Sequence, residues 1–77
     1  MTTQDFYKLI DQVVEVEPGT VKGSEQLAEF KAWDSLAAVG FIAAVDETLG
    51  VIVPAKQLIA AKSVEDLRLL VAGNLAD

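Results

Sequence analysis

The first apolar stripe of the chain predicts a helix over residues 3–16. Its apolar positions recur at intervals of three and four residues, as on one face of an α-helix: Phe6, Leu9, Ile10, Val13 and Val14. Thr2 or Thr3 can cap the start of this helix. We expect the pair Pro18–Gly19 to end it, because both residues interrupt a helical pattern.

A second and more apolar stretch predicts a helix from about Ser35 to Leu49. Asp34 is a suitable N-cap, and Gly50 is suited to the C-terminal end. Residues 36–45 are apolar on nearly every face of this helix. Such a helix is either central to the core or exposes an apolar face, and in a domain this small we expect both.

The rest of the chain predicts two further helices. No helix should cross Pro54, because a proline pushes the preceding residue into an extended conformation, so residues 51–53 are extended and a short helix covers about 54–60. The last helix should run over about 63–75, with Ser63 and Asp66 as a capping box. Its predicted buried stripe consists of Val64, Leu67, Leu70, Val71 and Leu75.

Residues 17–33 show no periodicity and predict a long first loop. We expect Val21 and Leu27 to fix this loop across the core and Trp33 to anchor its end, while residues 27–30 could form one helical turn. The predicted fold class is all-α. It is a small bundle of three main helices and one short helix, and it forms a single domain over residues 1–77.

The composition restricts the chemistry of the chain. Among its 77 residues there is no Cys and no His. Catalytic systems that need a His with a Ser or Cys nucleophile are therefore excluded, as is a Cys/His zinc site. We expect a non-catalytic protein that holds no metal.

The charge restricts the partners. Twelve acidic and six basic residues give a net charge of −6, which disfavours nucleic acid and anionic membranes and favours partners with basic patches. The apolar run over residues 36–45 is too short for a membrane span, which needs ~20 residues. We expect a monomeric, cytoplasmic protein.

The tripeptide Asp34-Ser35-Leu36 stands where the long loop enters the most apolar helix. Ser35 would be the first helical residue, with its hydroxyl near unpaired backbone N–H groups, which is a favourable place for a phosphate. Ordinary helix capping by Asp34 explains the same residues without any ligand.

The surrounding residues resemble the acyl carrier protein family, including its peptidyl-carrier and D-alanyl-carrier relatives. The similarity is strongest over residues 33–47 and continues through 49–54 and 63–67. It implies that Ser35 is esterified by the phosphate of 4′-phosphopantetheine, which a separate transferase donates from coenzyme A. Asp34 and Leu36 would complete this cofactor-binding motif, and the thiol of the arm would carry an acyl group as a thioester.

This chain departs from the fatty-acid carriers of that family along the second helix. Those relatives carry acids there for docking to basic partners, whereas Ala37 and Gly40 occupy such positions here. Phe41 either contributes to docking or packs in the core. The predicted partner-docking surface therefore consists of Ala37, Gly40, Phe41, Ala44, Asp46 and Glu47.

The resemblance implies an acyl carrier that serves a lipid, polysaccharide-modification or secondary-metabolite pathway. Its partners would be a phosphopantetheinyl transferase, an acyl- or aminoacyl-activating ligase, and acyltransferases or condensing enzymes. An aminoacyl carrier of the peptidyl or D-alanyl type is one alternative, and an unmodified helical interaction module is another. A hydrolase based on Ser35 is disfavoured, because no base is near it in sequence and the G-x-S-x-G motif is absent.

Overall fold

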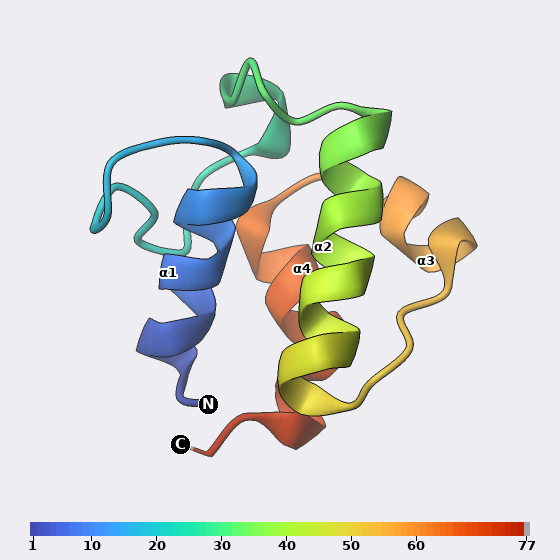
Figure 1. Cartoon of the computed structure of the whole chain (residues 1–77). Coiled ribbons are helices and arrows are strands. Elements are labelled where there is room, and N and C mark those ends of the chain that lie inside the picture. The colour runs from blue at the N-terminus through green and yellow to red at the C-terminus, as the bar shows by residue number, and fades with distance from the viewer. Residues whose placement is uncertain (77) are drawn as a thin grey trace.

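The computed structural model describes residues 1–76 and shows four α-helices, as the sequence predicts (Figure 1). The elements in chain order are α1 (Thr3–Val13), the 3₁₀ turn η1 (Leu27–Glu29), α2 (Ser35–Leu49), α3 (Ala55–Ala60), α4 (Val64–Val71) and the 3₁₀ turn η2 (Ala72–Asn74). Residues 1–76 contain no strand, and only an isolated antiparallel bridge joins Gln26 to Ser63. The predicted all-α bundle with a long first loop is confirmed.

Capping boxes begin α1 and α4. In α4 the Ser63 hydroxyl accepts the N–H of Asp66, and the Asp66 carboxylate accepts the N–H of Ser63. A further N–H, from Lys62, holds the pKa of the Asp66 carboxyl below its usual range. Thr2 and Asp5 form the same arrangement at α1. These side chains satisfy backbone donors that a helix leaves unpaired in its first turn.

Helix α1 ends at Val13, and the predicted end at residue 16 is wrong. Glu15 adopts a left-handed conformation with φ of 57°. Its N–H donates to the carbonyl of Gln12 at 3.3 Å, and the N–H of Val16 donates to the carbonyl of Asp11 at 3.0 Å. This pair of bonds is a Schellman motif, which closes a helix before the Pro18–Gly19 pair is reached.

Helix α4 is also shorter than predicted, since it ends at Val71 and gives way to η2. The predicted buried stripe is also incomplete, because Leu70 within α4 and Leu75 beyond it are only half-buried. The end of the chain turns toward its start, where the N–H of Ala76 donates to the carbonyl of Met1 at 2.8 Å. Helix α3 begins one residue later than predicted, with Pro54 as its cap.

The core lies where α1, α2 and α4 meet. The rings of Phe6 and Phe41 form an edge-to-face pair with centroids 6.0 Å apart. The ring of Trp33 forms a second edge-to-face pair with Phe41, with centroids 6.3 Å apart, so the predicted loop anchor is confirmed. The largest fully buried apolar side chains are Phe6, Phe41, Ile10, Leu67, Val14, Val45, Val64 and Val71.

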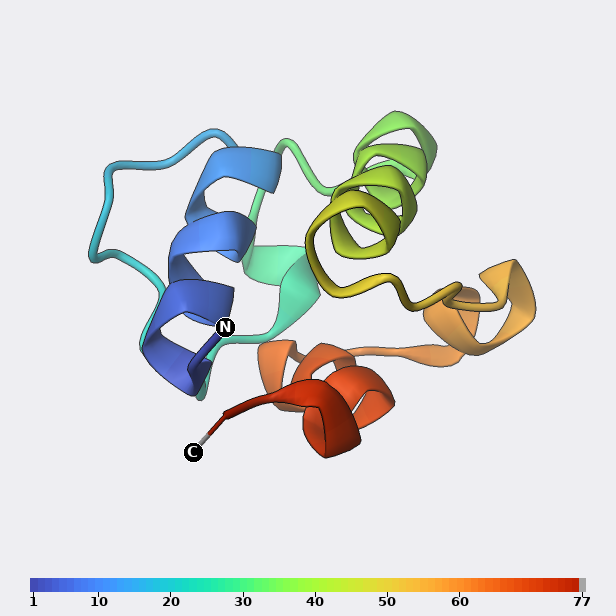
Figure 2. The ribbon, with the colours of Figure 1, turned by 60° about the horizontal axis from the view of Figure 1, so that its bottom comes forward.

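The long first loop runs from the end of α1 past the start of α4 to α2 and is fixed along this course (Figure 2). Asp11 of α1 is 1 % exposed, and its carboxylate accepts the N–H groups of Gly19 and Val21 at 2.8 and 2.9 Å. Further along, the N–H of Leu27 donates to the carbonyl of Lys62 at 2.9 Å. Val21 and Leu27 are both buried, as predicted. The loop therefore holds a defined course from α1 to the start of α2.

Candidate functional site

The start of α2 is set by Asp34. Its backbone is extended, and its Oδ1 accepts the N–H of Ala37 at 2.9 Å. Its carbonyl accepts the N–H of Ala38 at 2.9 Å. The predicted capping role of Asp34 is confirmed, and this cap makes Ser35 the first residue of the helix.

Ser35 is exposed at this position. The N–H groups of Ser35 and Leu36 donate to no described residue, because the first turn of a helix has no carbonyl in front of it. Leu36 is 78 % exposed. The hydroxyl of Ser35 is thus open to approach, and a phosphate attached to it gains free N–H donors and ~0.3–1 kcal/mol from the helix dipole.

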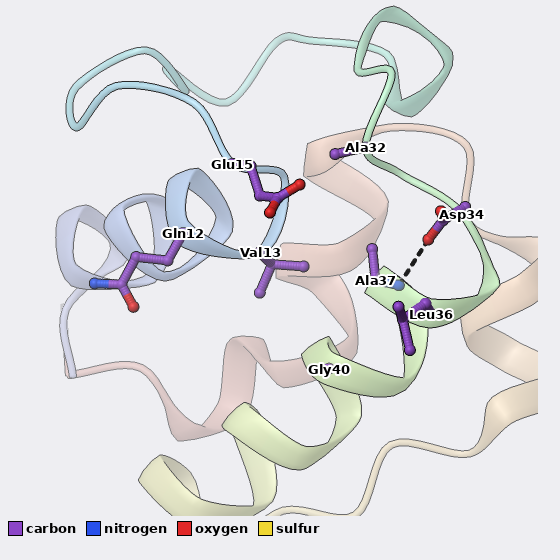
Figure 3. A pocket seen from close by; sticks show the side chains of 8 residues that line it. All are labelled: Gln12, Val13, Glu15, Ala32, Asp34, Leu36, Ala37 and Gly40. Carbon is purple, nitrogen blue, oxygen red and sulfur yellow. Dashed lines mark hydrogen bonds between the residues drawn. The ribbon is translucent and has the colours of Figure 1, made fainter.

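An open pocket of about 360 Å³ lies beside Ser35, between the end of α1 and the start of α2 (Figure 3). Both chain neighbours of Ser35 line it. The lining residues are Gln12, Val13, Glu15, Ala32, Asp34, Leu36, Ala37 and Gly40. The structure therefore brings four of the residues singled out from the sequence, Asp34, Leu36, Ala37 and Gly40, to one pocket.

Other predicted docking residues lie elsewhere. Phe41 is fully buried against Phe6 and Trp33. Of its two predicted roles, packing in the core is therefore confirmed and the assignment to the docking surface is wrong. Asp46 and Glu47 are exposed, but they lie ten or more residues beyond Leu36, about 15 Å along the helix axis. The predicted docking surface is thus split between the two ends of α2.

The outer face of α2 is apolar without being packed. Leu36 is 78 % and Val39 is 62 % exposed, while Phe41 and Val45 on the opposite side are fully buried. The expectation that this helix is both central to the core and apolar toward solvent is confirmed. No helix within residues 1–76 combines the length and apolar character that a membrane crossing needs.

Four of the lining residues were not foreseen from the sequence: Gln12, Val13, Glu15 and Ala32. In the chain they belong to the end of α1 and to the loop before α2. No local motif marks them, because their place beside Ser35 depends on how α1 packs against α2. Their only sequence signal is proximity to predicted helix ends.

The chain matches the family of phosphopantetheine attachment sites over residues 4–71. It therefore belongs to this family of carrier proteins, and the resemblance to acyl carrier proteins is confirmed. No curated protein matches the chain. The prosthetic group of the family is 4′-phosphopantetheine, and carriers of this kind interact with phosphopantetheinyl transferases and with the enzymes of their pathways.

The residues present fit such a group. The chain has no Cys, so it has no thiol of its own to form a thioester. Ser35 is exposed, and the backbone N–H groups of Ser35 and Leu36 beside its hydroxyl donate to no described residue. A carrier supplies an attachment point and presentation, while the group itself supplies the reactive thiol.

Proposed function

We propose that this chain is an acyl carrier protein that carries its acyl group on a 4′-phosphopantetheine arm attached to Ser35. The observation that supports this most is the exposed hydroxyl of Ser35 at the first position of α2, between Asp34 and the exposed Leu36. The chain performs no catalytic step in this proposal. It presents the arm to partner enzymes of a lipid, polysaccharide-modification or secondary-metabolite pathway.

The attachment step is a phosphoryl-group transfer. The Oγ of Ser35 forms a bond to the phosphorus that bears the pantetheine of coenzyme A. The bond from that phosphorus to the bridging oxygen breaks, and adenosine 3′,5′-bisphosphate leaves. The hydroxyl proton passes to a base of the transferase, because the chain has no His and Ser35 hydrogen-bonds to no described carboxylate.

Intact mass spectrometry tests the attachment. The full chain is incubated with coenzyme A, magnesium and a broad-specificity phosphopantetheinyl transferase. We expect the mass of one phosphopantetheinyl group to be added to the wild type and none to Ser35→Ala. Ser24→Ala is the matched control, because Ser24 is also exposed but lies in the first loop. No addition, or addition that survives in Ser35→Ala, would show that the proposal is wrong.

An aminoacyl carrier is the second candidate, and one observation favours it. The exposed face of α2 nearest to Ser35 is apolar, with Leu36, Val39 and Ala43, and its acids are confined to Asp46 and Glu47 at the far end. A partner that docks beside Ser35 therefore meets an apolar face and few acids. Offering the modified chain to a fatty-acyl ligase and to an aminoacyl-adenylating enzyme distinguishes the two candidates by the thioester formed.

A further inference from the structure

Gly40 is a residue of the pocket beside Ser35 that the helical bundle does not require. It lies inside α2, where glycine is ~1 kcal/mol less favourable than alanine. A Cβ at this position would meet no atom within 4 Å, so packing does not demand its absence. Because Gly40 has no side chain, the floor of the pocket is open at this position.

Glu15 lies on the facing wall of the same pocket and has an unusual backbone conformation (Figure 3). It is the only described non-glycine residue with a positive φ, a conformation that costs an L-residue roughly 1–2 kcal/mol. Its carboxylate and the amide of Gln12 hydrogen-bond to no described residue. This conformation closes α1, and Glu15 lines the pocket with an acceptor that is not used by the fold.

The chemistry of the lining restricts what the pocket can hold. Its polar side chains are Gln12, Glu15 and Asp34, and the two carboxylates can only accept hydrogen bonds. An anion is disfavoured there, whereas a neutral group with N–H donors and small apolar parts fits. Val13, Ala37 and Gly40 supply an apolar floor, and a volume of about 360 Å³ is within the range of small-molecule sites.

A group attached to Ser35 begins next to residues of this pocket, because Asp34 and Leu36 both line it and the Cα atom of each is about 3.8 Å from that of Ser35. Gly40 lies five residues further along, about 7.5 Å in the axial direction. The pantetheine part of the arm is neutral, with two amides and a pair of geminal methyl groups. Its amide N–H groups can donate to the free acceptors of the pocket, and its methyl groups can lie against the apolar floor.

We propose that this pocket is a resting site for the pantetheine part of the chain's own arm. An amide N–H group of the arm donates to the Glu15 carboxylate, and the geminal methyl groups lie over Val13, Ala37 and Gly40. The phosphate stays at the start of α2, away from Glu15. This inference rests on the proposed attachment at Ser35.

Nuclear magnetic resonance on the full chain, before and after mass-verified modification, tests the site. We expect the largest amide shifts outside residues 34–36 at Val13, Glu15 and Gly40. We also expect nuclear Overhauser contacts from the geminal methyl groups of the arm to the methyl groups of Val13 and Ala37. Modification at Ser35 without these shifts and contacts would overturn the resting site and leave the proposed function standing. Failure of modification itself would refute the proposed function.

Gly40→Leu fills the pocket with a good helix former, so the fold is expected to persist, and an amide spectrum verifies this. We expect the arm contacts to be lost in Gly40→Leu. They should persist in Ala43→Leu, the matched control, which places the same leucine side chain on α2 at an exposed position that does not line the pocket. Contacts that persist in a folded and modified Gly40→Leu, or that vanish equally in both variants, would overturn the resting site.

Discussion

At the scale of single residues, Glu15 closes α1 in a left-handed conformation that is strained for a residue with a side chain. Its φ of 57° is one that glycine adopts freely, while other residues pay roughly 1–2 kcal/mol. Glycine in turn loses more backbone entropy on folding, by about 0.5–1 kcal/mol. We therefore expect Glu15→Gly to raise the free energy of unfolding of the unmodified chain by about 0.5–1 kcal/mol. Urea denaturation measures this change.

Glu17→Gly is the matched control for Glu15→Gly. It removes the same charge from an exposed loop position, but its φ is not positive, so no strain is relieved. Any increase in the free energy of unfolding that comes from reduced repulsion among the acids should be similar in both variants. Equal changes in the two variants would show that charge rather than backbone strain explains the effect.

At the scale of elements, Asp11 couples α1 to the long first loop. Both of its carboxylate oxygens accept backbone N–H groups, from Gly19 and Val21, inside the fold. An amide at this position replaces one acceptor by a donor, which leaves a backbone N–H without a partner. We expect Asp11→Asn to lower the free energy of unfolding by about 1–3 kcal/mol and to speed hydrogen exchange at the Val21 amide.

Asp46→Asn is the control for this prediction, because Asp46 is exposed in α2 and its side chain holds no described backbone group. Its effect should stay within about 0.5 kcal/mol. If Asp11→Asn were as mild as Asp46→Asn, the carboxylate would not be what holds the loop on α1.

At the scale of the whole molecule, the net charge of −6 acts over the full width of the fold. The molecule measures 27 × 26 × 18 Å. The Debye length is about 30 Å at 0.01 M salt and about 10 Å at 0.1 M. Acids on opposite sides therefore repel each other at the lower concentration and are screened at the higher one.

We expect the thermal midpoint of unfolding to rise when sodium chloride is increased from about 0.01 M to about 0.1 M at neutral pH. Differential scanning calorimetry measures this shift. A matched series with magnesium chloride at equal ionic strength separates general screening from ion-specific binding. A midpoint that does not move between the two concentrations would contradict the importance of self-repulsion in this fold.

Local signals in the sequence were sufficient for the helix count and for α2. Asp34 and Gly50 act within one turn of their own helix, so the bounds of α2 agree with the prediction at both ends. The capping box of Ser63 and Asp66 is equally local. The end of α1 was not predictable in this way, because glutamate is not a residue that typically takes the left-handed position of Glu15.

The sequence by itself determined the helical class, the family and the position of Ser35, because periodicity, caps and a short motif each depend on neighbours in the chain. Only the tertiary structure decided which face of the apolar part of α2 is buried, and so placed Phe41 in the core and Leu36 in solvent. It also decided that Val13 and Glu15 meet Ala37 and Gly40 in one pocket. The physical reason is that packing α1 against α2 brings together residues that are distant in the chain, and no local pattern records that contact.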